Sequence, residues 1–361
     1  MQKFGDLLCC MHENNDIFHV EVIWPKSVLR NFFIHNKFRK WAGYIDKYLI
    51  FPAILKKKIR NSTNKYNLIH IIDHSNSPYL NTIKKLTKVK CLITCHDLIA
   101  IRTALGEFKT APKTSLLGKK LQSWILKSLN KADYYACDSI QTKKDLNIKI
   151  PSSTNFSKVI HLGTEFTLYS SKNIDAVDKN FVFKATETKY ILHVGSDAWY
   201  KNRKCVIKAF KYAKEMHRQT ELKLVLVGPE PQPHEIDSTL KDWLRLNSNH
   251  IIIIKNVSMK ELIYLYKNAI LLIFPSFIEG FGWPPLEASV LGCPVITTTC
   301  GAIEEILSEN VNYINPYNQK QINNTLIQVI QRKQNSIPLN VPSNSSCIRN
   351  YAQYYKMIIE D

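Results

Sequence analysis

The sequence predicts an α/β protein built from two doubly wound, Rossmann-like parallel sheets with helices on their faces. Short apolar segments of strand length alternate with helix-like segments along most of the chain, and this alternation is typical of parallel sheets. The alternation stops over residues 163–184 and then begins again. A chain of 361 residues is long for one hydrophobic core and long enough for two.

The first half of the chain predicts one domain, residues 1–165. Residues 1–11, 116–129 and 141–146 have the apolar spacing of helices. The segments with the composition of strands are residues 18–23, 68–72, 90–95, 134–137 and 158–160.

The second half predicts a polar linker at residues 166–184 and a second domain at residues 185–341. Ser258 is a suitable N-cap for one of its helices. Residues 342–361 form a predicted C-terminal helix that can cross back to the first domain. The predicted strands are residues 190–194, 223–227, 251–254, 269–274 and 295–298, and the predicted helices are residues 204–216, 259–268, 284–291 and 347–359.

The net charge of +19 is concentrated in the first half. Residues 1–165 contain 27 Lys and Arg against 12 Asp and Glu, and residues 166–361 contain 22 against 18. Within residues 26–60, ten basic residues face only Asp46. This bias is compatible with a solvated surface, with adhesion to an anionic membrane or an anionic acceptor, or with nucleic acid.

We do not expect the basic surface to bind nucleic acid. No DNA- or RNA-binding motif is visible, and only nine of the 49 basic residues are arginine, the residue that most often reads bases. The alternatives that stay open are a solvated surface and peripheral contact with an anionic membrane.

Compartment and covalent chemistry follow from the apolar runs and the cysteines. The chain starts without the apolar segment of a signal peptide, and its apolar runs are far shorter than a membrane span. We therefore expect a cytoplasmic protein, with the inner face of the cell membrane as an alternative. The nine cysteines are scattered and odd in number, which argues against a disulfide framework.

Residues 279–287 are the segment with the clearest chemistry. They follow a buried strand and lead through Gly280 and Gly282 into a helix that begins near Pro284 and Pro285. Glycines let a backbone approach a ligand closely, and a helix N-terminus favours a phosphate. Glu287, about one turn into the helix, can bind vicinal sugar hydroxyls. The segment indicates a site for a ligand with both phosphate and sugar hydroxyls.

The same segment resembles the E-x7-E signature of the retaining glycosyltransferases of family 4, which have the GT-B fold. Residues 279–287 read Glu-Gly-Phe-Gly-Trp-Pro-Pro-Leu-Glu. Further similarity covers nearly the whole chain, at residues 292–296, 301–305, 191–195 with Lys201-Asn202, 224–228, Val257 with Leu262 and Tyr266, His96-Asp97, and Asp138-Ser139.

The resemblance implies a role for each matching residue. Glu279 would face the donor sugar, Lys201 would neutralise the diphosphate, and Arg203 would replace the arginine usual beside that lysine. His96 would lie near the donor sugar, across from the second domain. The implied donor-binding residues are Gly195, Ser196, Gly228, Val257, Gly280, Phe281, Gly282 and Glu287.

The implied reaction is transfer of a hexose-type sugar from a nucleotide sugar to a saccharide or lipid-linked acceptor, with retention, in polysaccharide biosynthesis of the cell envelope. A lysine, an arginine and a helix N-terminus can stabilise a departing diphosphate without a metal, and no Asp-x-Asp metal motif is present. We therefore expect no metal and no cofactor beyond the nucleotide-sugar substrate. The alternatives are another GT-B enzyme, an epimerase or phosphorylase, and a non-catalytic nucleotide-sugar-binding subunit.

The N-terminus departs from the family pattern. The family's first domain opens with a strand and a glycine-rich loop, whereas here residues 1–11 resemble the helix that follows them. Either the start site is set too late or the chain is truncated. We expect the first, because loss of a central strand would expose a sheet edge and apolar helix faces.

Overall fold

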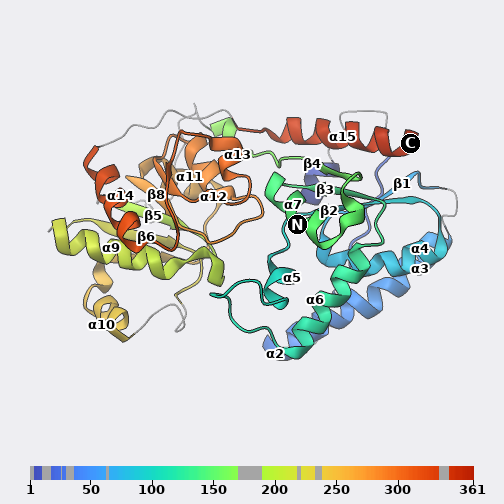
Figure 1. Ribbon diagram of the computed structural model, residues 1–361, viewed down its shortest axis with the longest axis horizontal. Helices are drawn as coiled ribbons and strands as arrows, with labels where there is room; N and C mark the ends of the chain where they lie inside the picture. Colours follow the sequence, from blue (N-terminus) through green and yellow to red (C-terminus); the bar gives the residue numbers. More distant parts are fainter. Residues whose placement is uncertain are drawn as a thin grey trace.

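The computed structural model describes residues 4–9, 18–25, 27–29, 36–61, 65–169, 189–217, 221–231, 238–332 and 341–361. Figure 1 shows two α/β units side by side, with the last helix running along the N-terminal one. Most of the predicted linker lies outside the described residues, as do residues 1–3 and 10–11 of the first predicted helix.

Every described strand pair is parallel. The N-terminal sheet has the order β1-β2-β3-β4, and the C-terminal sheet has the order β10-β9-β8-β5-β6-β7. The strands are β1 (Leu68–Ile71), β2 (Lys90–Cys95), β3 (Tyr134–Cys137), β4 (Ser157–Val159), β5 (Tyr190–Val194), β6 (Lys223–Val227), β7 (Ile251–Ile254), β8 (Leu271–Phe274), β9 (Val295–Thr297) and β10 (Asn312–Tyr313).

Helices connect these strands and cover both faces of each sheet. In the N-terminal unit they are residues 4–9, α2 (Asn36–Ile45), the π-helix η2 (Asp46–Ile50), α3 (Phe51–Arg60), η3 (His74–Tyr79), α4 (Leu80–Leu86), α5 (Ile99–Ala104), α6 (Leu116–Leu129), α7 (Ile140–Lys149) and η4 (Pro151–Ser153). The others are η5 (Phe166–Tyr169), η6 (Trp199–Lys201), α9 (Arg203–His217), α10 (Ser238–Leu246), η8 (Ser248–His250), α11 (Met259–Asn268), α12 (Trp283–Val290), α13 (Ile303–Leu307), α14 (Gln319–Arg332) and α15 (Asn344–Glu360).

The N-terminal sheet is buried on both faces. Successive side chains of a strand point to opposite faces of the sheet, and these strands are apolar at nearly every position, so both faces need to be covered. Ile93 and Tyr135 point to a core shared with α3, α4 and α6. Leu92, Tyr134 and Ala136 point the other way, to a core that contains α15 and the helix of residues 4–9. The last helix of the chain therefore completes the core of the first unit (Figure 1).

Tyrosines hold α15 on that sheet. The hydroxyl of Tyr351 lies 3.1 Å from Thr94 Oγ1, and the hydroxyl of Tyr355 lies 2.7 Å from His70 Nδ1. The hydroxyl of Tyr354 donates to the carbonyl of Phe156 at 3.0 Å. Because Tyr351 and Tyr354 are buried, these contacts give each phenol a polar partner inside an apolar core.

The C-terminal sheet is likewise covered on both faces. Ile191 and Leu224 contribute to a core with α9, α10 and α14. Leu192, Val225 and Leu272 contribute to the opposite core, with α11, α12 and α13. Ser258 and Glu261 form a capping box at the start of α11, which confirms the predicted N-cap.

The two chain crossings between the units lie side by side. The N–H of Thr164 donates to the carbonyl of Pro342 at 3.0 Å, and Thr164 forms a parallel bridge with Ser343. A Cβ on Gly163 would lie 2.2 Å from the carbonyl carbon of Ser343, so glycine is needed for this close approach.

The strand predicted at residues 18–23 is wrong: the described residues 18–25 belong to neither sheet. Side chains hold this segment instead of a backbone ladder. Phe18 packs edge-on against Tyr355, and Glu21 accepts hydrogen bonds from Tyr66 and Lys65. The apolar residues that suggested a strand are thus used by side-chain packing alone.

Helical structure over residues 36–60 is absent from the sequence prediction, and a π turn explains why. The buried positions of this helical segment are Ala42, Asp46, Phe51, Leu55 and Ile59. The step from Asp46 to Phe51 spans the π-helix and is one residue longer than the others, which interrupts the regular helical spacing. In the part of the chain that the structure describes, no helix is long and apolar enough to cross a membrane.

Candidate active site

The glycines that end β5 and β6 lie next to each other at the carboxyl edge of the C-terminal sheet, where α/β proteins bind ligands. The N–H of Gly195 donates to the carbonyl of Val227 at 3.0 Å. A Cβ on Gly228, whose φ is +134°, would lie 2.1 Å from the carbonyl oxygen of Gly195. Only glycine allows the two loops to touch in this way.

Arg203 lies beneath these loops at the start of α9. Its guanidinium is buried and donates to the carbonyl of Gly195 at 2.6 Å and to that of Pro229 at 2.5 Å. Arg203 therefore ties the loops after β5 and β6 together. Arg203, expected from the resemblance at a diphosphate, thus has its guanidinium beneath the loops that follow β5 and β6.

Lys201 and Glu279 form a buried ion pair at the same edge. Lys201 Nζ lies 2.8 and 3.0 Å from the two carboxylate oxygens, and the side chains are 13% and 7% exposed. The ammonium also lies 4.8 Å from the centre of the Phe274 ring. Burial raises the pKa of Glu279, although Lys201 opposes that shift.

The turn that carries Lys201 is fixed by its neighbour. Asn202 has a left-handed backbone, with φ of 52°, a conformation that asparagine tolerates. Its Nδ2 donates to the carbonyls of Pro275 and Pro316 at 3.1 and 3.2 Å. This turn therefore holds the ammonium of Lys201 against the end of β8.

The loop after β8 reaches α12 through Gly282. The φ of Gly282 is +94°, and a Cβ there would lie 2.4 Å from Ile303. No side chain caps α12, so its first turn can accept an anion. Pro284 and Pro285 lack N–H groups, which leaves the N–H groups near Gly282 and Trp283 as the donors at this end.

Glu287 lies half-buried on α12 and accepts a hydrogen bond from the hydroxyl of Tyr266 at 2.9 Å. Tyr266 is fully buried on α11, so it fixes the direction of the carboxylate. Phe281 is buried between Gly280 and Gly282, while Ser196 is exposed after β5 and Val257 is half-buried after β7.

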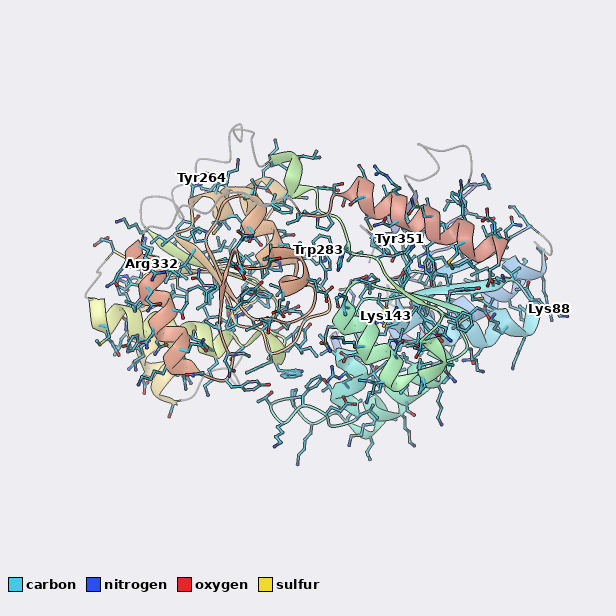
Figure 2. The ribbon with its side chains drawn as sticks, turned by 45° about the horizontal axis from the view of Figure 1, so that its top comes forward. Lys88, Lys143, Tyr264, Trp283, Arg332 and Tyr351 are labelled. Atoms are coloured by element: carbon cyan, nitrogen blue, oxygen red, sulfur yellow. The ribbon has the colours of Figure 1, made fainter. Side chains whose placement is uncertain are left out.

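The N-terminal unit meets this edge through the loop after β2. A Cβ on Gly280 would lie 2.1 Å from the carbonyl oxygen of His96 and 2.9 Å from Cβ of Asp97. Gly280 therefore allows the two units to touch backbone to backbone. Figure 2 shows Trp283 of α12 and Lys143 of α7 on the sides of the two units that face each other.

The ring of His96 is fully occupied by its own unit. Nδ1 lies 2.6 Å from Asp138 Oδ2, and Nε2 lies 2.9 Å from the carbonyl oxygen of Ile72. Burial disfavours the charged ring, but Asp138 and that carbonyl outweigh it and raise the pKa of His96 to about 9. The structure brings the His96 backbone to the junction and turns its ring into the N-terminal unit.

Two residues at this junction, Asp97 and Tyr200, are missing from the sequence-predicted site. The charge of Asp97 adds to the burial that raises the pKa of Glu279, and the charge of Glu279 adds to the burial that raises the pKa of Tyr200. The pattern His96-Asp97 after a strand could have identified Asp97, but the prediction assigned the site role to His96 alone. Among the described residues, no group of three or more His, Cys, Asp and Glu side chains could hold a metal ion.

This two-unit arrangement is the GT-B fold. Sucrose-phosphate synthase from Thermosynechococcus elongatus has a TM-score of 0.66 at 17% sequence identity, over 88% of this chain and 79% of that one. HepE of Anabaena, solved in complex with UDP and glucose, has a TM-score of 0.66 at 15% identity, over 86% of this chain and 82% of that one.

The family comparison is narrower. Residues 176–346, somewhat less than half of the chain, match the model of the family Glycosyl transferases group 1. The O-antigen chain mannosyltransferase RfbU of Salmonella typhimurium is 26% identical over 215 residues, which are 59% of this chain. That match covers 56% of RfbU, so the chain spans little more than half the length of this curated relative.

Proposed function

We propose that the protein is a retaining glycosyltransferase that moves a hexose-type sugar from a nucleotide sugar to a saccharide or lipid-linked acceptor. The observation that carries this proposal is the buried Lys201–Glu279 pair beside Gly195, with Glu287 held nearby by Tyr266. The group 1 domain and the mannosyltransferase relative support it.

In this proposal the C-terminal edge binds the whole donor. Glu287 accepts hydrogen bonds from the ribose hydroxyls, and Glu279 accepts one from the donor sugar. The diphosphate lies against Gly195, Gly228 and the first turn of α12, whose unpaired N–H groups and dipole favour negative charge. HepE, which shares the fold, was solved with UDP and glucose.

Lys201 supplies the positive charge that stabilises the leaving group. Breaking the anomeric C–O bond places negative charge on the departing diphosphate, and a fixed cation stabilises that charge. Without substrate, Glu279 already neutralises the Lys201 ammonium. A bound diphosphate competes for this ammonium, which then lies between the leaving group and the carboxylate facing the sugar.

In this scheme Arg203 and His96 each act by holding loops of the site in place. Arg203 keeps the Gly195 and Gly228 loops together, so that the two loops present one continuous surface to the phosphates. His96 fixes the loop after β2, which contacts Gly280. We propose that no metal takes part; transfer should then continue unchanged in excess chelator.

The basic half of the chain supports contact with an anionic membrane surface. The segments α2–α3 and α6 contain one acidic residue, Asp46, and it is buried, where it accepts hydrogen bonds from the N–H groups of Val28 and Leu29. Large apolar side chains are exposed on the same helices: Phe38, Ile45, Leu49, Ile54, Leu116, Leu117 and Trp124. Exposed apolar groups among lysines are typical of interfacial helices.

The test begins with a panel of nucleotide sugars screened for thermal stabilisation, since a ligand of the folded state raises the melting temperature. With the best donor, Glu287→Ala and Lys201→Ala should each slow acceptor-dependent nucleotide release about 100-fold or more. Lys255→Ala is the control, because Lys255 pairs with Glu230 at the exposed surface of the same unit. If neither site variant slows release, the site is misplaced.

The product decides between the possible reactions. The anomeric configuration of the product, read by NMR, should match that of the donor. Formation of an epimeric sugar from the donor without acceptor would instead indicate an epimerase, and sugar phosphate formed with added phosphate would indicate a phosphorylase. Donor binding with no turnover of any kind would indicate a non-catalytic subunit.

A further inference from the structure

Asp97 is a carboxylate of the N-terminal unit that lies next to the Lys201–Glu279 pair. It follows β2 directly after His96, and its Cβ lies beside the backbone of Gly280. Its charge adds to the raised pKa of Glu279 and of Tyr200, which places all three groups at one junction.

Half of the Asp97 carboxylate is already used. Oδ1 accepts a hydrogen bond from the N–H of Ile99, the first residue of α5, at 2.8 Å. Among the described residues, Oδ2 has no hydrogen-bond partner, and the side chain is half-buried. The carboxylate is thus held by one oxygen and has the other available for a donor from a ligand.

The charges around Asp97 define which ligand suits it. Glu279 pairs with Lys201, and the negative charge of Asp97 disfavours the ionised form of Glu279 at this junction, so an added phosphate next to Asp97 would be repelled. A neutral hydroxyl donates a hydrogen bond to a carboxylate, and such bonds to ionised groups are stronger than those between neutral groups.

The unit to which Asp97 belongs indicates which of the two substrates it contacts. Every residue proposed to bind the donor belongs to the C-terminal unit, whereas Asp97 belongs to the N-terminal unit. We propose that Asp97 accepts a hydrogen bond from the attacking hydroxyl of a neutral sugar acceptor, an inference that rests on the proposed transferase function. Asp97 holds that hydroxyl opposite the donor sugar bound by Glu279, and a positioned hydroxyl reacts faster than a free one.

The substitution Asp97→Asn separates this role from the hydrogen bond to Ile99. The amide oxygen of asparagine can accept that hydrogen bond as well, so the bond to α5 is kept while the charge is lost. The matched control is Asp73→Asn, because Asp73 follows β1 of the same sheet and accepts a hydrogen bond from the N–H of Ser75 at 2.8 Å. Melting temperatures of both variants report on folding, and Asp97→Glu, which keeps the charge, serves as a second variant.

The assay uses UDP-glucose and GDP-mannose as donors and octyl α-glucoside and octyl α-mannoside as acceptors. Asp97→Asn should lower kcat/KM for the acceptor about 10- to 100-fold. Donor affinity by calorimetry and donor hydrolysis without acceptor should stay within about twofold of the unaltered protein. Asp73→Asn should behave as the unaltered protein, and Asp97→Glu should recover part of the loss.

Normal transfer by Asp97→Asn overturns the inference. So does a loss of donor binding or hydrolysis as large as the loss of transfer, because Asp97 would then act on the donor. Absence of both donor binding and transfer in the unaltered protein overturns the proposed function itself, and with it this inference.

Discussion

At the scale of single residues, His96 joins groups that are distant in sequence. Its ring contacts Asp138, the carbonyl of Ile72 and the edge of the Phe4 ring. These partners come from the ends of three segments of the chain, so the ring position depends on the complete N-terminal unit.

The raised pKa of His96 predicts a pH-dependent stability. The folded-state pKa of about 9 lies above the ordinary value of 6.5, so the folded protein holds this proton more tightly than the unfolded chain. The contribution is complete below pH 6.5 and is lost as the pH rises through 9. Melting temperatures of the unaltered protein and of His96→Asn, measured from pH 6 to 10, should therefore converge at high pH.

The control for this experiment is Asp138→Asn, which removes the charge that holds the proton. Its melting temperature should lack the same pH-dependent component. A difference between the unaltered protein and His96→Asn that is equal at both ends of the range would contradict the prediction.

The sequence alone could place His96 at the end of a strand, but not the direction of its ring. Asp138 is 42 residues away and belongs to another strand end. Arg203 shows the same limit, since the carbonyls that accept from it belong to loops whose approach depends on Gly228 having no Cβ. Glu279 and Glu287 were predictable together because their motif is local in sequence, whereas Lys201 pairs with Glu279 from 78 residues away.

At the scale of elements, Glu305 links the two units. Its carboxylate accepts hydrogen bonds from the N–H of Ile140 at 2.9 Å and of Gln141 at 3.3 Å, at the start of α7. It also lies 2.8 Å from Nε2 of His161. Burial opposes ionisation, but these partners prevail and lower the pKa of Glu305. A residue of α13 thereby binds the N-terminus of a helix in the other unit.

Glu305→Gln should loosen this contact. Loss of charge-assisted hydrogen bonds predicts a decrease of about 1–3 kcal/mol in the free energy of unfolding, with faster hydrogen exchange at the amides of Ile140 and Gln141. The matched control is Glu304→Gln, because Glu304 is the exposed neighbour on the same turn. Equal exchange in the two variants would show that Glu305 does not hold α7.

The strands were more predictable than the helices. Buried parallel strands are continuous apolar runs, and β2, β3, β5, β6 and β7 have the predicted bounds. The segment α2–α3 was missed because its π turn breaks the helical period. The strand prediction for residues 18–23 was wrong because apolar composition alone does not distinguish a strand that is hydrogen-bonded in a sheet from a segment that is held by side-chain packing.

At the scale of the whole molecule, charge and exposed apolar surface are unevenly distributed. The helices of the N-terminal unit carry both, while the proposed donor site belongs to the C-terminal unit. This arrangement would let the first unit rest on an anionic membrane while the second exchanges its nucleotide with solvent.

Vesicle binding tests that arrangement. The protein should bind vesicles of phosphatidylglycerol more tightly than vesicles of phosphatidylcholine, and binding should weaken with added salt. Lys56→Glu with Lys57→Glu on α3 should weaken binding at least about tenfold, since each surface charge contributes about 1 kcal/mol. Both lysines are exposed.

The control reverses two exposed lysines of the other unit, Lys241 and Lys260. This variant has the same net charge as the first, so it separates a local surface from the overall charge of the protein. Equal weakening in both variants would leave no role for the N-terminal helices.

The position of α15 has a consequence for the order in which the chain matures on the ribosome. Tyr351, Tyr354 and Ile358 belong to the core of the unit that is synthesised first, yet they emerge only after the C-terminal unit. Domains generally fold as they emerge, from the N-terminus. Here one face of the first unit's sheet is covered only by the helix of residues 4–9 until α15 has been translated, so the later half of the chain can complete its folding before the earlier one.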